Sequence, residues 1–534
     1  MKSRIIDRAN KKISFGGVAA LLMATALIAQ VLGFLKVKFI NANFDYLGTE
    51  STDAFFAAFK VPDFFFYTVA AGALGVAFIP FLADHLEKHD KEGVWELASS
   101  LLNLMAVATA FVGVIIFIFA EPLISHIVAP GMNHHQLHDA TIIMRLIAFN
   151  PFLFTLSGIL TATQQVFGRF FFYAIGPIVY NLSIILSIFI FKNNIGLIGL
   201  GIGALVGALL QLMVVFFGMG GMNFKWKPTI NFKSPDFRHI LRLLPSRSVD
   251  QGIDSINSIV ETNFASKIGT GAVTFYESAY TLHTAPIILI GNSIATAAFP
   301  RMSERLSQGH YDLFRKEFLK ILRIMIWIAV PVVVVCFFAR GYLARIIFSR
   351  GAPEIAAIFG FLCVAIFFRI VYAIVSRYFY AQKDTWTPLV VSIIAIALNI
   401  YLAWQLSRPA NYGVSGLAMA QSIVAAVEVL ILFSILIVKD VRLFDRQFWG
   451  GIWQIMSVTG FSVVATYVML QIFPLLSTDT GFLTLGVKLG LITFVTGIVH
   501  LGLSSLFGLE EAVPVIAKMR QFTRFILRPV KIGW

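Results

Sequence analysis

The chain has 534 residues, of which 58% are hydrophobic and only 13% are charged. A water-soluble core could not bury this much apolar surface, so the composition excludes a soluble globular protein and indicates one that crosses a membrane many times. The net charge of +14 does not indicate a nucleic-acid partner, because the basic residues lie in short clusters between apolar segments, as in the cytoplasmic loops of membrane proteins.

Apolar windows of about 20 residues follow one another along the chain, separated by charged breaks or by breaks that contain Gly or Pro. The sequence therefore predicts an all-α polytopic membrane protein with 14 transmembrane helices. We expect the first window to be an uncleaved helix, because its apolar run continues to Leu35 and is longer than the hydrophobic region of a signal peptide usually is. The predicted spans are residues 15–35, 54–82, 97–120, 140–162, 171–191, 196–218, 240–266, 275–299, 317–339, 355–380, 386–406, 413–438, 449–473 and 483–507.

Lysine and arginine alternate between rich and poor loops along this series of spans. Because basic residues stay on the cytoplasmic side, this alternation predicts that both termini are cytoplasmic. The loop from Arg340 to Arg350 is the exception, with three arginines on the poor side. It fits either an interfacial segment or one that contacts anionic lipid headgroups.

The first six spans resemble the next six. Pro80 corresponds to Pro300, and Gly196, at the start of one glycine-containing span, corresponds to Gly413. Each unit contains an even number of spans, so the two halves share one orientation, with a cavity expected between them. We therefore predict two pseudo-symmetric six-helix lobes, at residues 1–222 and 223–440. A C-terminal helix pair with a basic tail follows, at residues 441–534.

The second span contains Asp53, Lys60 and Asp63 within otherwise apolar sequence. An ionisable side chain in a transmembrane segment costs about 2.5–3.5 kcal/mol on insertion scales, so these residues indicate a polar protein interior. We expect this helix to line the cavity of a transporter. Two structural interpretations stay open: Lys60 and Asp63 could form an ion pair around Pro62, and Asp53 could cap a helix.

The seventh span carries a polar stripe with spacings of three and four residues, which places its members on one helical face. This face is either a cavity wall that contacts substrate or a coupling ion, or a self-compensating structural network. Lys36, Lys38, Arg145, Arg369 and Arg377 are further cations in or at the ends of spans that could bind a diphosphate. Lysines near helix ends can instead extend to the membrane interface, which we expect for Lys38. The stripe consists of Arg247, Asp250, Asp254, Asn257 and Glu261.

Several chemistries have no support in the sequence. It contains no GxxxxGK[ST], HExxH or GxSxG motif and no large soluble domain, which argues against ATP-driven transport and familiar hydrolytic catalysis. His134, His135 and His138 fit a surface loop better than a zinc site. We therefore expect no catalytic residues, no metal site and no cofactor apart from a coupling cation.

Eight stretches, spread in order over the first twelve spans, resemble the MurJ/MviN family of lipid II flippases in bacterial peptidoglycan synthesis. They are VLGFLKVKF from Val31, TDAFFAAFKVPDFFF from Thr52, GALGVAFIP from Gly72, GRFFFYAIGPIVYNLSII from Gly168, LPSRSVDQGIDSINSIVETNFAS from Leu244, IATAAFPRMSE from Ile294, IIFSRGAPE from Ile346 and SRYFYAQKDTWTPL from Ser376.

The resemblance implies a fold of the multidrug and oligosaccharidyl-lipid exporter type, with alternating access between two lobes. It implies a cationic cavity for the diphosphate-linked headgroup of lipid II and a groove by the last two helices for the polyprenyl tail. The implied location is the bacterial cytoplasmic membrane, where membrane lipids and cell-wall synthesis proteins are candidate partners of an expected monomer.

The resemblance also assigns site residues. Asp53 matches the family's TDAF aspartate, Lys60 matches the lysine of its FK-P segment, and Lys36 replaces the arginine after its LGF motif. Arg247 matches the arginine after Leu-Pro in the seventh span. Our candidate headgroup-binding residues are Lys36, Asp53, Lys60, Arg145 and Arg247, and our candidates for ion coupling are Asp250, Asp254 and Glu261.

The chain departs from the family where well-known members carry further arginines, and the departures are Gln30, Phe66, Tyr67 and Thr281. We still predict a lipid II flippase, a transporter rather than an enzyme, driven by Na⁺, H⁺ or the membrane potential. The alternatives are a cation-coupled exporter of amphipathic small molecules and a flippase for another polyprenyl-linked oligosaccharide. A glycosyltransferase or ligase would need a larger extracytoplasmic loop than this chain has.

Overall fold

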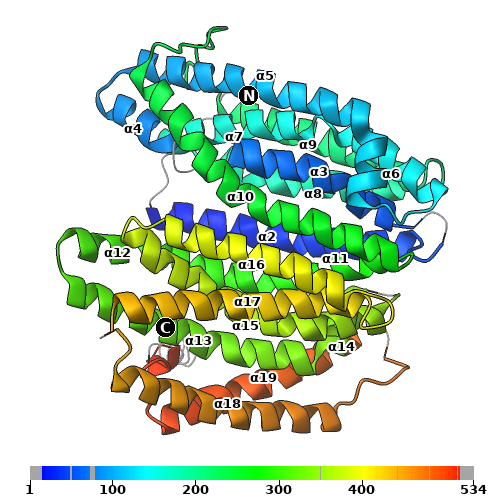
Figure 1. Cartoon of the computed structure of the whole chain (residues 1–534), viewed down its shortest axis with the longest axis vertical. Helices are drawn as coiled ribbons and strands as arrows, with labels where there is room; N and C mark the ends of the chain where they lie inside the picture. The colour runs from blue at the N-terminus through cyan, green and yellow to red at the C-terminus, as the bar shows by residue number, and fades with distance from the viewer. Residues whose placement is uncertain are drawn as a thin grey trace, which may run out of the picture. The chain divides into compact units, whose positions relative to one another are not determined.

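A computed structural model of the chain describes residues 15–48, 51–71, 78–348, 350–441, 443–479, 481–513 and 515–517 (Figure 1). The described residues form helices and connecting turns and no β-strand, which confirms the all-α fold class. The basic N-terminal cluster and most of the predicted basic tail lie outside these residues.

The chain divides into two compact units, residues 1–277 with 403–414 and residues 278–402 with 415–534. Helices α11 (Ala272–Pro286) and α16 (Trp386–Leu406) contribute residues to both units. The predicted division into lobes at residues 222 and 440 stays a prediction.

The first unit also contains α2 (Phe15–Asn43), α3 (Asp53–Phe65), the π-helix η1 (Phe66–Ala71), α4 (Ile79–Glu87), α5 (Lys91–Pro122), the π-helix η3 (Leu123–Val128), α6 (His134–Ile147), α7 (Asn150–Val166), α8 (Phe171–Phe191), α9 (Ile198–Gly218) and α10 (Pro235–Ile268).

The second unit contains the C-terminal helices. Its other members are the π-helix η4 (Ile287–Asn292), α12 (Ser293–Ser307), α13 (Tyr311–Phe338), α14 (Arg340–Ile347), α15 (Ala352–Ala381), α17 (Val414–Lys439), α18 (Arg446–Ile472) and α19 (Phe482–Leu506).

Twelve helical segments in the described residues are long and apolar enough to cross a membrane, and each coincides with a predicted span. The two predicted spans outside this set, residues 54–82 and 240–266, contain α3 with η1 and most of α10. Both of these spans include residues that lie outside the described part of the chain. The total of fourteen therefore stays a prediction.

The π-helices η1, η3 and η4 each follow a proline. Pro62 precedes η1, Pro122 ends α5 before η3, and Pro286 ends α11 before η4. Proline has no N–H for the i→i−4 bond, so the helix continues with wider turns beyond it. The pattern of α-helix, π-helix and α-helix recurs in α3–η1–α4 and α11–η4–α12, which supports the internal repeat read from the sequence.

Helices α8 and α9 pack closely because glycines lie where they meet. A Cβ on Gly199 would lie 2.3 Å from Phe191 Cβ, and a Cβ on Gly203 would lie 2.1 Å from Ser187 Oγ. Ser183 Oγ donates to the Gly203 carbonyl at 2.9 Å. Gly199 and Gly203 therefore form a glycine ladder, a packing surface in which small residues let two backbones approach within the membrane.

Helices α18 and α19 lie beside α13 (Figure 1). Buried polar side chains link these three helices. Trp327 Nε1 donates to Ser504 Oγ at 2.9 Å, and His500 Nδ1 lies 3.0 Å from Ser462 Oγ. Apolar side chains gain little by leaving hydrocarbon for another apolar surface, so such hydrogen bonds help to set the register of membrane helices. The C-terminal pair is thus attached to α13 by specific contacts.

The glycine ladder yields a stability prediction. The Gly203→Ala substitution should lower the free energy of unfolding by about 1–3 kcal/mol, because Ser187 must move to make room. Gly460→Ala in α18 is the matched control, since no atom lies within 4 Å of its added Cβ. Thermal denaturation in detergent would measure both variants, and equal melting temperatures would contradict the packing role of Gly203.

Candidate substrate-contacting site

Asp53 is the first residue of α3, and its carboxylate binds the start of another helix, α11. The Gly271 and Thr274 N–H groups donate to it at 2.6 and 2.7 Å, and the Thr274 hydroxyl donates at 2.6 Å. The side chain is buried, with Asp53 only 2% exposed. These donors and the positive end of α11 stabilise the carboxylate without any bound substrate.

The local backbone fits this contact. Gly271 has φ of +89°, and a Cβ there would lie 2.9 Å from the Tyr46 carbonyl oxygen. Thr52 Oγ1 lies 2.9 Å from Thr274 Oγ1, which adds a second link between α11 and the residues that start α3. The sequence had suggested a cap at Asp53, but the helix that it caps lies about 220 residues further along the chain.

Lys60 lies on the same helix as Asp53, about two turns further on. Its ammonium donates to Ser258 Oγ of α10 at 2.7 Å and forms an ion pair with Glu277 of α11. The side chains of Lys60 and Glu277 are 11% and 19% exposed. The ion pair that the sequence suggested was Lys60 with Asp63, whereas the direct partner in the structure is Glu277.

Lys36 of α2 completes a charged cluster with Lys60, Asp63 and Glu277. Lys36 is half-buried and interacts electrostatically with Asp63, which also interacts with Lys60 and with Glu277. Two ammonium groups and two carboxylates lie close together, so the cluster is formally neutral. Such a cluster can bind an anion if a carboxylate gives up its cation to the incoming ligand.

Arg145 of α6 has a local partner. Its Nε donates to the Phe117 carbonyl at 3.3 Å. Phe117 lies two residues before Phe119, where α5 departs from helical geometry with φ −96° and ψ 15°. Arg145 therefore satisfies a carbonyl near the kink in α5, a contact that the charge alone did not predict.

The polar stripe on the seventh predicted span lies on α10. The side chains of Arg247 and Asp250 lie outside the described part of the chain. Asp254 is exposed, while Glu261 is buried and accepts a hydrogen bond from Asn257 Nδ2 at 3.0 Å. The pairing of Asn257 with Glu261 agrees with the predicted four-residue spacing on one face.

A second polar network lies in the second unit. Arg369 Nη1 is 3.1 Å from Glu428 Oε2, and Ser392 Oγ donates to Glu428 Oε1 at 2.8 Å. The Tyr372 hydroxyl lies 3.0 Å from Ser392 Oγ. Glu428 is only 2% exposed. Arg369 and Ser392 therefore compensate a carboxylate that is buried in the protein.

Sequence reasoning missed Glu277, Ser258 and Thr274 in the first unit and Ser392 and Tyr372 in the second. Glu277 had a usable signal, because it is an ionisable residue inside a predicted span, as Lys60 is. The hydroxyl residues had none, since serine, threonine and tyrosine are common in membrane helices. In the described residues, no group of three or more His, Cys, Asp or Glu side chains could hold a metal ion.

Known proteins share this fold. A solved structure titled "Lipid II flippase MurJ, inward closed conformation" matches with a TM-score of 0.73 and 20% identity, covering 90% of this chain and 98% of that chain. An inward-facing multidrug resistance MATE transporter of the MOP superfamily matches with a TM-score of 0.66 and 15% identity, covering 80% of this chain and 98% of that one.

Sequence comparisons agree with the structural ones. A protein of Borreliella burgdorferi named as a probable lipid II flippase MurJ is 24% identical over 433 residues, which cover 79% of this chain and 83% of that protein. The family model described as lipid II flippase MurJ matches residues 45–487, most of the chain. The chain therefore belongs to the lipid II flippase MurJ family.

Proposed function

We propose that the protein moves lipid II from the inner to the outer leaflet of the bacterial cytoplasmic membrane by alternating access, without nucleotide hydrolysis. The observation that carries this proposal is the family match over residues 45–487. As a member of this family, the chain is a multi-pass protein of the bacterial inner membrane. We further propose that both termini are cytoplasmic, that the protein acts as a monomer, and that it is a transporter rather than an enzyme.

The charged cluster of Lys36, Lys60, Asp63 and Glu277 is our candidate contact for the diphosphate of the headgroup. The diphosphate would compete with Glu277 for the Lys60 ammonium and with Asp63 for Lys36. Such an exchange keeps both ammonium groups paired, and charge balance then requires the displaced Glu277 and Asp63 carboxylates to take up protons or another cation. Arg247 stays a candidate for the same headgroup, and Arg145 is the weaker candidate because it already has a carbonyl partner.

Asp53 is better suited to conformational control than to headgroup binding. Its carboxylate already accepts three hydrogen bonds from Gly271 and Thr274, and a buried anion would repel a diphosphate. We propose that this contact closes the extracytoplasmic side while the substrate enters from the cytoplasm. It must break for the site to open outward.

The driving force is a separate proposal. Asp250, Asp254 and Glu261 of α10 are our candidates for binding a coupling Na⁺ or H⁺. The buried Glu261 would change charge on protonation, whereas the exposed Asp254 would meet a cation from solvent. The membrane potential, acting directly on the charged substrate, is the alternative.

A second candidate function is the cation-coupled export of amphipathic small molecules. The structural match to a MATE transporter favours it, because that fold similarity covers 80% of this chain. The non-basic residues Gln30, Phe66, Tyr67 and Thr281 at family arginine positions also favour it. Family membership favours the flippase.

Lys60 provides a direct test of the headgroup contact. Lys60→Gln should reduce lipid II transport in proteoliposomes by about tenfold or more, because a charge-assisted hydrogen bond is worth about 1.5–3 kcal/mol. The measurement is the fraction of lipid II that becomes accessible in the opposite leaflet. Lys91→Gln, at an exposed lysine at the start of α5, is the control and should transport normally.

A double variant separates substrate binding from folding in the Lys60 experiment. Lys60→Gln leaves Glu277 without its ion-pair partner, so part of its effect could be structural. The combined K60Q/E277Q variant removes both charges and should recover thermal stability without recovering transport. Recovery of transport in the double variant would assign Lys60 a structural role and refute the headgroup contact.

Asp53 provides a test of the closure. Asp53→Asn removes the negative charge that three donors share, and the outward-open state should become more populated. With both native cysteines replaced by alanine, a Ser258→Cys probe should then react about tenfold faster with an impermeant maleimide added outside. Asp45→Asn, at an exposed aspartate, is the matched control. Unchanged labelling in the Asp53 variant would contradict the closure.

A further inference from the structure

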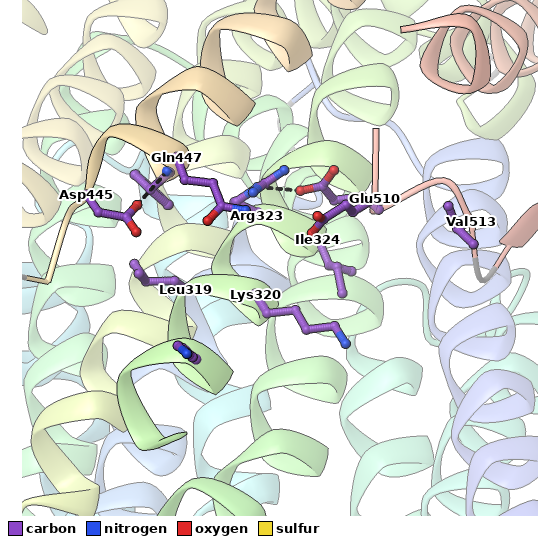
Figure 2. Close-up of a pocket in the computed structure, with 11 residues that line it drawn as sticks. Leu319, Lys320, Arg323, Ile324, Asp445, Gln447, Glu510 and Val513 are labelled. Carbon is purple, nitrogen blue, oxygen red and sulfur yellow. Dashed lines mark hydrogen bonds and ion pairs between the residues drawn. The ribbon is translucent and has the colours of Figure 1, made fainter. Parts of the chain in front are cut away.

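A cavity of about 540 Å³ lies in the second unit and shares no lining residue with the networks described above (Figure 2). Lys316, Lys320 and Arg323 line it from α13, and Asp445 lines it from the residue before α18. Glu510 and Glu511 line it from the segment that follows α19. Its volume lies within the usual range of small-molecule sites, about 300–1,000 Å³.

Two of the three acids already have partners. Asp445 accepts the Phe448 N–H at 2.7 Å and so caps the N-terminus of α18. The Glu511 carboxylate forms an ion pair with the Arg323 guanidinium, and the two side chains are 4% and 12% exposed. The ion pair neutralises Glu511, whereas Asp445 keeps its negative charge, which the positive end of α18 partly offsets.

Lys316 and Lys320 remain, one helical turn apart on the same face of α13. Both are exposed, and neither forms an ion pair with any described residue. The exposed Glu510 is the one cavity-lining acid without a partner in the described part of the chain. The ionisable groups that line the cavity therefore sum to zero formal charge, but Lys316 and Lys320 are two adjacent cations without an ion-pair partner among the described residues, and the positive end of α18 partly offsets Asp445. This local pair of cations suits a singly charged anion.

The cavity also offers an acceptor. Glu511 is only 6% exposed, and its Oε2 atom has no hydrogen-bond partner among the described residues. A buried acceptor without a donor costs about 1–3 kcal/mol, so a fitting ligand would bring a donor to this oxygen. The ligand should thus combine a phosphate-like anion with a hydroxyl group.

The position of the cavity matches the headgroup depth of a bilayer. The predicted spans 317–339, 449–473 and 483–507 all begin or end within a few residues of its walls. Trp449 and Trp453 of α18 are 50% and 67% exposed and lie one turn apart near the cavity. Exposed indoles of this kind are typical of the membrane interface.

We propose that this cavity binds the headgroup of an anionic glycerophospholipid of the phosphatidylglycerol type from the cytoplasmic leaflet. The phosphodiester contacts Lys316 and Lys320, and a headgroup hydroxyl donates to Glu511 Oε2. The lipid bridges α13, α18 and the segment after α19, and so holds the C-terminal helix pair in place. This site shares no residue with the charged cluster of Lys36, Lys60, Asp63 and Glu277. The lipid that binds here is not the transported lipid.

The experiment measures lipid binding to the full chain in detergent, by native mass spectrometry and by the shift in melting temperature. Phosphatidylglycerol, phosphatidylethanolamine, phosphatidylcholine and free glycerol phosphate are added separately. The K316Q/K320Q variant should bind phosphatidylglycerol about tenfold to thirtyfold more weakly, since each basic residue near an anionic headgroup is worth about 1 kcal/mol. The K91Q/K225Q variant removes two exposed lysines elsewhere and should bind within about twofold of the unmodified chain.

Glu510→Gln removes a negative charge from the cavity, whereas K316Q/K320Q removes positive charge, so the two variants should change lipid affinity in opposite directions. Removal of this unpaired acid should tighten phosphatidylglycerol binding by about fivefold. Each variant is first compared with the unmodified chain in lipid-free detergent, and equal melting temperatures confirm that it is folded.

Three results would overturn the proposal. Equal losses of phosphatidylglycerol affinity in K316Q/K320Q and K91Q/K225Q would show that the lipid binds to any basic part of the protein surface. Equal stabilisation by free glycerol phosphate would show an ion site that does not recognise a lipid. A preference for phosphatidylethanolamine would contradict the charge assignment.

Discussion

Compensation of buried charge is the constraint on which this structure depends. Lys60 has Glu277 and Ser258, Arg369 has Glu428, and the Asp53 carboxylate has three donors. An uncompensated charge at such a depth costs about 2.5–3.5 kcal/mol on insertion scales. These contacts therefore allow charged side chains to lie inside helices that are otherwise apolar.

The same constraint shapes how a charged headgroup could be transported. Cations that face an open site without counter-charge would bind a diphosphate strongly and release it slowly. Cations that are already paired exchange one anion for another, and the cost of binding stays moderate if the displaced carboxylates take up protons or another cation. The neutral cluster of Lys36, Lys60, Asp63 and Glu277 suits such an exchange, even though several arginines of well-known family members are replaced here by Gln30, Phe66, Tyr67 and Thr281.

Much of the fold could be predicted from the sequence. Hydropathy located twelve spans that the structure also contains. The partners of the charged residues could not be predicted in this way. Asp53 caps a helix about 220 residues away, and nothing local to Asp53 distinguishes that role from a cap on its own helix. Arg145 likewise bonds to a carbonyl near a kink, which no pattern of charges reveals.

The most direct test of the central claim, lipid II transport, is to deplete the protein in its native cells and measure how much lipid II is exposed on the outer leaflet. The account predicts that this exposure falls as the protein is lost and returns when the unmodified chain is supplied again. Unchanged exposure after depletion would contradict the flippase function and favour an exporter of other amphipathic molecules.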